Sequence, residues 1–236
     1  YTVPYNVEVV YRWNQGDVSS DDMRKNLVPP RESQVEPFLE MIEKVWMDTY
    51  TAEVGQQTLR SYIPKQLLLV GSASYNDDGS TTEGTAEGGR QIVLYSVNDF
   101  NFELEQIQSY AHVMHHEFAH ILHQNVEYDA EFEKITPSYS SSWMQMNDET
   151  ARSKGFITAY AFSSADEDFA EMVSIMLTNS PEDWDNMIEN AGNAAAVEAL
   201  RKKEAIVVAY MKNNWGVNMK DFQKEVVAAI EAAVRN

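Results

Sequence analysis

The chain has 236 residues, 44% of them hydrophobic and 11% aromatic, which is enough to bury a sizeable core and excludes disordered and fibrous proteins. Acidic side chains outnumber basic ones by 37 to 18, so the net charge of −19 would repel a nucleic acid backbone. The absence of cysteine excludes disulfides and cysteine-ligated zinc sites.

The first part of the chain contains short stretches that are typical of β-strands. Residues 6–13 are rich in β-branched and aromatic side chains and end at a turn cluster, which predicts a strand. Apolar residues recur at helical spacing over residues 32–50, which predicts a core helix. Two short apolar runs, 67–71 and 91–95, predict further strands, and the polar, glycine-rich stretch 72–90 between them predicts a loop.

From residue 102 onward the pattern changes to long segments with helical spacing. The predicted helices cover residues 102–124, 166–178, 181–190, 194–213 and 219–235. Strands followed by helices predict an α+β fold, and no repeat or low-complexity linker divides the chain. We expect a single domain over residues 1–236; if it consists of two lobes, we expect them to be 1–125 and 126–236, with a cleft between them.

All five histidines lie within the predicted helix 102–124, where residues 116–120 fit the pattern His-Glu-x-x-His. On a helix, His116 and His120 lie one turn apart on the same face, so both imidazoles can bind one zinc ion. Glu117 lies beside that face and can take a proton from a zinc-bound water as the water attacks a carbonyl. The alternative is a chance match in which both histidines are ordinary side chains.

A candidate third ligand lies on the predicted helix 166–178. Residues 167–171 read Glu-Asp-Phe-Ala-Glu, which places Glu167 and Glu171 one turn apart on one face. We expect Glu167 to bind the metal ion and Glu171 to hydrogen-bond a histidine ligand through its other ring nitrogen. The alternative for a chain this acidic is a solvated acidic face.

The other histidines fit a single metal site less well. The segment from His112 to His123 spans about 16 Å of helix, which is too long for one ion. His115 points about 100° away from His116 and is expected to pack or to hydrogen-bond. We expect His112 and His123 to stabilise neighbouring carboxylates, although a direct metal role stays open for all three. The metzincin pattern is excluded because Val126 occupies its third histidine position.

Together the two motifs resemble the gluzincins, in which a glutamate on a later helix completes the zinc site, as in thermolysin and in anthrax lethal factor. Lethal factor has a similar second motif and a tyrosine seven residues before its glutamate ligand, where this chain has Tyr160. The resemblance implies that the phenol of Tyr160 donates a hydrogen bond to the oxyanion of the tetrahedral intermediate. A Tyr160 that is simply buried is the alternative.

Segments spread over nearly the whole chain are similar to the zinc-binding metallo-peptidases of Bacteroidetes: residues 4–13, 27–30, 35–39, 64–66, 84–90 and 115–124. Members of that family are lipoproteins associated with outer-membrane substrate-import systems. The resemblance implies a zincin-like α+β fold, with a small mixed sheet, an active-site helix and a mostly helical C-terminal part, and one zinc ion per chain. It also implies an exported outer-membrane lipoprotein, facing the periplasm or the cell surface, whose anchored cysteine precedes Tyr1.

In zincins the edge strand near the cleft can pair with an extended substrate, and residues 91–95 are the candidate here; a hairpin without substrate contact is the alternative. We therefore predict a gluzincin-type zinc metallopeptidase that acts on a peptide or protein, with an import receptor and its lipoprotein as partners. Two other hypotheses stay open: a non-catalytic or vestigial accessory component of the import complex, and zinc-dependent hydrolysis of a non-peptide bond. The predicted site consists of His116, His120 and Glu167 as metal ligands, Glu117 and Tyr160 as catalytic residues, and Glu171 as their support.

Overall fold

A computed structural model describes residues 1–14, 16, 18, 25–76, 81–87 and 90–235 of the chain. It divides into two compact units: unit 1 comprises Tyr1–Ile121 and Ala229–Asn236, and unit 2 comprises Leu122–Ala228. The fold is α+β with a small mixed sheet, as the sequence predicts. The single domain over residues 1–236 stays a prediction, as do the two lobes.

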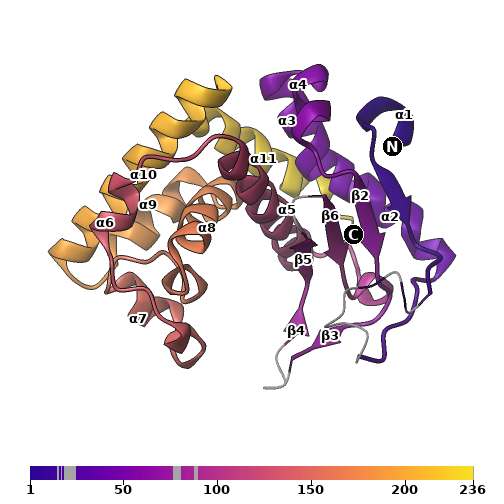
Figure 1. Ribbon diagram of the computed structural model, residues 1–236, viewed down its shortest axis with the longest axis horizontal. Helices are drawn as coiled ribbons and strands as arrows, with labels where there is room; N and C mark the ends of the chain where they lie inside the picture. Colours follow the sequence, from indigo (N-terminus) through magenta and orange to yellow (C-terminus); the bar gives the residue numbers. More distant parts are fainter. Residues whose placement is uncertain (15, 17, 19–24, 77–80, 88–89, 236) are drawn as a thin grey trace. The chain divides into compact units, whose positions relative to one another are not determined.

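Unit 1 contains a four-stranded sheet with the strand order β1-β2-β6-β5 (Figure 1). Its strands are β1 (Glu8–Val10), β2 (Gln66–Leu69), β6 (Gln91–Leu94) and β5 (Gly84–Glu87). β1, β2 and β6 are parallel, and β5 runs antiparallel to β6 at the edge. Leu67 of β2 pairs with Val9 and with Ile92. Apolar runs such as those of β2 and β6 suit parallel strands whose two faces are both covered.

The expected helix over residues 32–50 forms and extends further along the chain. The helical elements of this part are α1 (Thr2–Tyr5), α2 (Glu32–Ile42), the π-helix η3 (Glu43–Met47), α3 (Asp48–Val54), α4 (Gln56–Tyr62) and the 3-10 helix η4 (Val97–Asp99). α2, η3 and α3 follow one another without a break, and Phe38, Ile42 and Trp46 are all fully buried. The apolar stripe that predicted the helix is therefore a core face.

Helix α5 (Leu104–Asn125) corresponds to the predicted helix 102–124. The hydroxyl of Tyr110 donates a hydrogen bond of 2.7 Å to the carbonyl of Tyr95, just after β6. Gly84 of β5 lies so close to the helix that an added Cβ would overlap the side chain of Val113. Within unit 1, α5 is therefore fixed against the end of β6 and against the edge strand.

Two expectations for the first part of the chain are wrong in detail. The strand over residues 6–13 shortens to β1, which pairs with β2 only over Glu8–Val10; beyond it, the indole N–H of Trp13 donates to the carbonyl of Leu69 at 2.8 Å. The predicted loop 72–90 contains β3 (Ser74–Tyr75), β4 (Thr81–Thr82) and β5. The prediction that residues 91–95 are the edge strand is therefore wrong: they contain the interior strand β6, and the edge strand beside α5 is β5.

Unit 2 is helical in its described residues. Its elements are α6 (Glu131–Ile135), the 3-10 helices η5 (Ser141–Gln145) and η6 (Tyr160–Phe162), α7 (Asp148–Arg152), α8 (Ala165–Thr178), α9 (Pro181–Glu189), α10 (Ala194–Trp215) and most of α11 (Met219–Ala233). The four long helices match the predicted segments within a few residues. Side chains of Ser164, Ser180 and Asn193 cap α8, α9 and α10 at their N-termini.

Among the described helices of both units, none has the length and apolarity needed to cross a bilayer.

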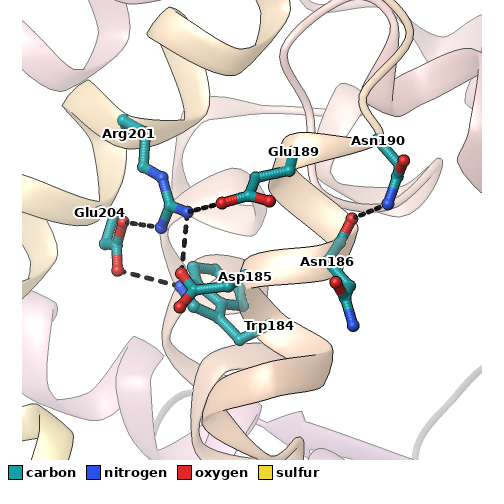
Figure 2. Close-up of polar contacts among 7 residues, drawn as sticks. All are labelled: Trp184, Asp185, Asn186, Glu189, Asn190, Arg201 and Glu204. Carbon is teal, nitrogen blue, oxygen red and sulfur yellow. Dashed lines mark hydrogen bonds and ion pairs between the residues drawn. The ribbon is translucent and has the colours of Figure 1, made fainter.

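A polar network joins α9 to α10 (Figure 2). The guanidinium of Arg201 on α10 lies 2.8 Å from carboxylate oxygens of both Asp185 and Glu204, and 3.9 Å from Glu189. Glu204 also accepts a hydrogen bond of 3.0 Å from the indole of the buried Trp184. Because Arg201 keeps 35% of its side chain exposed, each of its ion pairs is worth about 1 kcal/mol or less.

A buried ion pair joins α10 to α8. The ammonium of Lys203 lies 2.5 Å from the carboxylate of Asp168, and both side chains are completely buried. Lys203 also donates to the carbonyl of Gly155 at 2.8 Å and lies 4.1 Å from the ring centre of Phe156, while Tyr139 donates to Asp168 at 3.0 Å. Burial raises the pKa of Asp168 to about 6, although Lys203 opposes this rise, and burial lowers the pKa of Lys203.

Removal of the buried cation should destabilise the protein far more than removal of an exposed one from the same helix. Lys203→Met leaves the carboxylate of Asp168 buried without its counter-ion, so we expect the free energy of unfolding in urea to fall by about 3–5 kcal/mol. Lys202→Met removes an exposed cation from the neighbouring position, where Lys202 pairs with the exposed Glu198 at 2.7 Å; it is the matched control and should cost about 1 kcal/mol or less.

The double variant Lys203→Met/Asp168→Leu replaces both charges by apolar groups and should recover much of the loss, because no charge is then left unpaired. Equal losses for Lys203→Met and Lys202→Met would contradict this account.

Candidate metal centre and active site

Helix α5 places the first two candidate ligands on one face. The Nε2 atoms of His116 and His120 are 3.1 Å apart, and the ring centres are separated by 4.8 Å. His116 is buried, with 5% of its surface exposed, whereas His120 is half-buried. The structure thus brings together the two imidazoles that the four-residue spacing pairs.

The spacing of these nitrogen atoms fits a zinc ion. Two nitrogen ligands that bind one tetrahedral zinc ion at about 2.0–2.1 Å lie roughly 3.3 Å apart, close to the separation of the two Nε2 atoms. Histidine and glutamate side chains that could hold a metal ion are present in the described part of the chain. The residues of α5 therefore fit two of the ligand positions of such a site.

Glu117 lies on the same helix, directly after His116, and its side chain is half-buried. Helix geometry places it about 100° around the axis from His116 and within one turn of His120. A carboxylate in this position flanks the face that carries the two imidazoles. Its proximity to that face is what a proton acceptor for an attacking water needs.

His115 differs from its neighbour His116 in the contacts of its imidazole ring. It is fully buried, its Nε2 donates a hydrogen bond of 3.2 Å to the carbonyl of Val45, and its ring lies 5.5 Å from that of Tyr50. Burial lowers the pKa of His115 to about 3, so the side chain is neutral. The expectation that His115 packs and hydrogen-bonds is confirmed.

The other two histidines lie near opposite ends of the motif. The ring of His112 lies 5.8 Å from that of His116, one turn earlier on the same face of the helix. His123, in the part of α5 that belongs to unit 2, is buried and meets the rings of Tyr128 at 5.5 Å and Phe169 at 6.0 Å. These contacts give His123 a packing role in the last turn of α5.

Helix α8, in unit 2, carries the two candidate carboxylates. Glu167 is half-buried in the first turn, and its backbone N–H donates to the side chain of Ser164 at 3.3 Å. Glu171 is buried, with 3% of its surface exposed, and accepts a hydrogen bond of 2.5 Å from the hydroxyl of Thr158. The roles assigned to Glu167 and Glu171 stay predictions, but Glu171 is already held in one orientation by Thr158.

Tyr160 lies at the start of η6, seven residues before Glu167. It keeps 37% of its surface exposed, and its ring meets that of Trp143 at 4.9 Å in an edge-to-face contact. The alternative of a simply buried tyrosine is therefore wrong. Its role at the oxyanion stays a prediction.

Sequence reasoning missed the buried pair of Asp168 and Lys203, although Asp168 directly follows Glu167. The signal was present: Lys203 lies between Leu200 and Val207 on the buried stripe of α10, a position where a charged residue needs a partner. The ion pair between Lys203 and Asp168 anchors the first turn of α8, which also carries Glu167.

Two comparisons with known proteins found a matching family and a similar solved structure. Residues 1–220 match the family described as "Putative zinc-binding metallo-peptidase". The chain is also similar to a protein from Bacteroides caccae ATCC 43185, whose crystal structure is described as that of a putative zinc-binding metallo-peptidase. The two are 33% identical with a TM-score of 0.83, and the match covers 99% of this chain and 89% of that one. No curated protein matches the chain.

These findings confirm the resemblance seen in the sequence segments. The structural match extends over almost the whole chain, so both units take part in it. The family match covers the His-Glu-x-x-His motif and the acidic motif of α8. The chain therefore belongs to the family of putative zinc-binding metallo-peptidases.

Proposed function

We propose that the protein is a zinc-dependent metallopeptidase of the gluzincin type, with one zinc ion held by His116, His120 and Glu167. The observation that carries this proposal is the 3.1 Å separation of the two Nε2 atoms on one helix face, in a chain that belongs to a zinc-binding family. Glu167 supplies the third ligand by its chemistry, because a carboxylate complements two imidazoles in catalytic zinc sites.

Zinc, when bound, would polarise the scissile carbonyl and lower the pKa of a water molecule. Glu117 accepts the proton of the attacking water on a carboxylate oxygen. It then passes this proton to the nitrogen of the departing amine, which becomes a neutral leaving group. One carboxylate beside the two imidazoles therefore serves both proton transfers.

Two further side chains assist these steps in the proposal. Glu171, held by the hydroxyl of Thr158, orients a histidine ligand by accepting a hydrogen bond from its other ring nitrogen. The phenol of Tyr160, which is partly exposed, donates a hydrogen bond to the oxyanion that forms on the substrate. The role of Tyr160 follows the gluzincin resemblance, whereas that of Glu171 follows from its position one helical turn after Glu167.

An extended peptide would add to the sheet of unit 1 at β5. This strand pairs with β6 on one side and forms the end of the described sheet, and Gly84 brings it close to Val113 of α5. Backbone hydrogen bonds to β5 would hold the substrate without regard to its side chains, as in other cases of strand addition. β5 therefore takes the place expected for residues 91–95 as the strand that pairs with the substrate.

We also propose that the protein works as an exported outer-membrane lipoprotein beside an import receptor and that receptor's lipoprotein. The support is the resemblance to import-associated lipoproteins over segments that span nearly the whole chain. A peptidase in this place would cleave peptides or proteins before their uptake.

Glu117→Gln tests the proton acceptor. The variant keeps the size of the side chain but loses its basicity, so we expect kcat on a cleaved peptide to fall about 10²- to 10⁴-fold. Metal analysis should still find one zinc ion per chain. Glu105→Gln, at an exposed position in the first turn of α5, is the matched control and should change neither value. Unchanged turnover in Glu117→Gln would contradict the proposed mechanism. A wild-type protein that binds zinc but cleaves no peptide in a diverse library would instead favour the accessory role.

Zinc affinity separates the two glutamates of α8. We expect Glu171→Gln to weaken zinc binding about 10- to 100-fold, as loss of an orienting group does, and Glu167→Gln to weaken it further because a ligand is lost. Competition with a chromophoric chelator measures the zinc dissociation constant of each variant. Glu182→Gln, at an exposed position in α9, should bind zinc like the wild type. A larger effect for Glu171 than for Glu167 would reverse the assignment.

Fractionation of the native cells tests the location. We expect the protein to sediment with outer membranes on a density gradient, away from an inner-membrane marker, and to co-purify with a receptor after mild solubilisation. Protease treatment of intact cells then distinguishes the surface from the periplasmic face. Recovery in the cytoplasm would contradict the lipoprotein proposal and leave the proposed chemistry untouched.

A further inference from the structure

Helices α2 and α3 are joined by a π-helical turn, η3 (Glu43–Met47). The backbone N–H of Asp48 donates to the carbonyl of Glu43, five residues earlier. Such turns are rare within α-helices and are frequently found at functional sites. Val45 and Trp46, in the middle of this turn, are completely buried. The widened turn therefore faces the core of unit 1, where its neighbour is α5.

The carbonyl of Val45 receives two side-chain contacts. Nε2 of His115 lies 3.2 Å away, and the hydroxyl of Thr49 lies 3.3 Å away. In a regular α-helix a carbonyl points along the axis toward the N–H four residues on, so a contact from a neighbouring helix requires it to tilt outward. A carbonyl can only accept, which means that Nε2 of His115 carries the hydrogen. The π turn and His115 thus form a buried link between η3 and α5.

Aromatic rings reinforce this link. The ring of Tyr50 lies 5.5 Å from that of His115 and 4.7 Å from that of Phe118, three residues further along α5. Trp46, inside the π turn, meets Phe118 at 5.6 Å in an edge-to-face contact. One face of α5 is therefore held by a hydrogen bond and by oriented ring contacts.

The rotation of α5 decides where its ligands point. A ring nitrogen of His116 or His120 lies roughly 7 Å from the helix axis, so a rotation of about 10° displaces it by about 1 Å. Metal sites tolerate deviations of only about 0.2 Å in ligand distance. His115 precedes His116 directly, so the link to Val45 acts within one residue of the first ligand.

We propose that His115 and the π turn η3 are a positioning pair that fixes the rotation of α5 and so aims His116 and His120 at one metal ion. This inference rests on the proposed function, because it assigns a purpose in zinc binding. His115 is a positioning residue that acts through its neighbours. Its Nε2–H donates a hydrogen bond to the carbonyl of Val45, and its ring is buried in the core.

The test measures zinc affinity of the metal-free full chain by chelator competition, alongside the melting temperature. His115→Phe keeps the ring contact but removes the N–H donor, and we expect it to raise the zinc Kd about 10- to 100-fold. His115→Gln restores a donor at a similar reach and should bind zinc more like the wild type than like His115→Phe. Leu68→Ala, in the buried strand β2, creates a cavity away from α5 and should lower the melting temperature without changing the zinc Kd.

Equal zinc affinity in the wild type and His115→Phe would overturn the proposal. The proposal would also be overturned if His115→Phe and Leu68→Ala lowered the melting temperature by similar amounts and raised the zinc Kd by similar amounts. If His115→Phe does not fold, nitrogen NMR of the wild type decides: we expect the hydrogen of His115 on Nε2 and in slow exchange, and a hydrogen on Nδ1 instead would overturn the link. A wild type that binds no zinc would contradict the proposed function, which the NMR measurement does not depend on.

Discussion

The rotational position of α5 is the constraint on which the site depends. Two imidazoles four residues apart can share one ion only while their helix neither turns nor frays. Unit 1 fixes this helix at successive turns, through Tyr110 at the end of β6, His115 at the carbonyl of Val45, and Phe118 among aromatic rings. The sheet and the α2–η3–α3 segment thus serve mainly as a rigid support for one helix.

In unit 2 the corresponding problem is electrostatic. The start of α8 carries several carboxylates close together, in a chain of net charge −19, and these repel one another. The helix N-terminus favours negative charge, and separate donors stabilise individual groups: Tyr128 for Asp166, Lys203 for Asp168 and Thr158 for Glu171. A cation bound by Glu167, as proposed, would reduce this repulsion further.

The elements of this protein differ in how far local sequence determines them. The long helices were predictable because each buries a continuous apolar stripe, and the motif of His116 and His120 needs only helical spacing. Strand β5 was not, since it lies in a glycine-rich stretch that reads as a loop and depends on pairing with β6. The π turn was hidden for a different reason: its residues have the same apolar pattern as an α-helix, and only the hydrogen bonding of Asp48 to Glu43 reveals it.

The two adjacent histidines show why residue type alone does not assign a role. His115 and His116 have the same side chain and neighbouring positions, yet helix geometry directs them about 100° apart. The buried Nε2 of His115 holds its hydrogen against the carbonyl of Val45, so that nitrogen has no lone pair for a metal ion. Nε2 of His116 instead faces that of His120 at a distance suited to sharing an ion. On a ligand-bearing helix, the residues that face the core therefore determine the geometry of the residues that face the site.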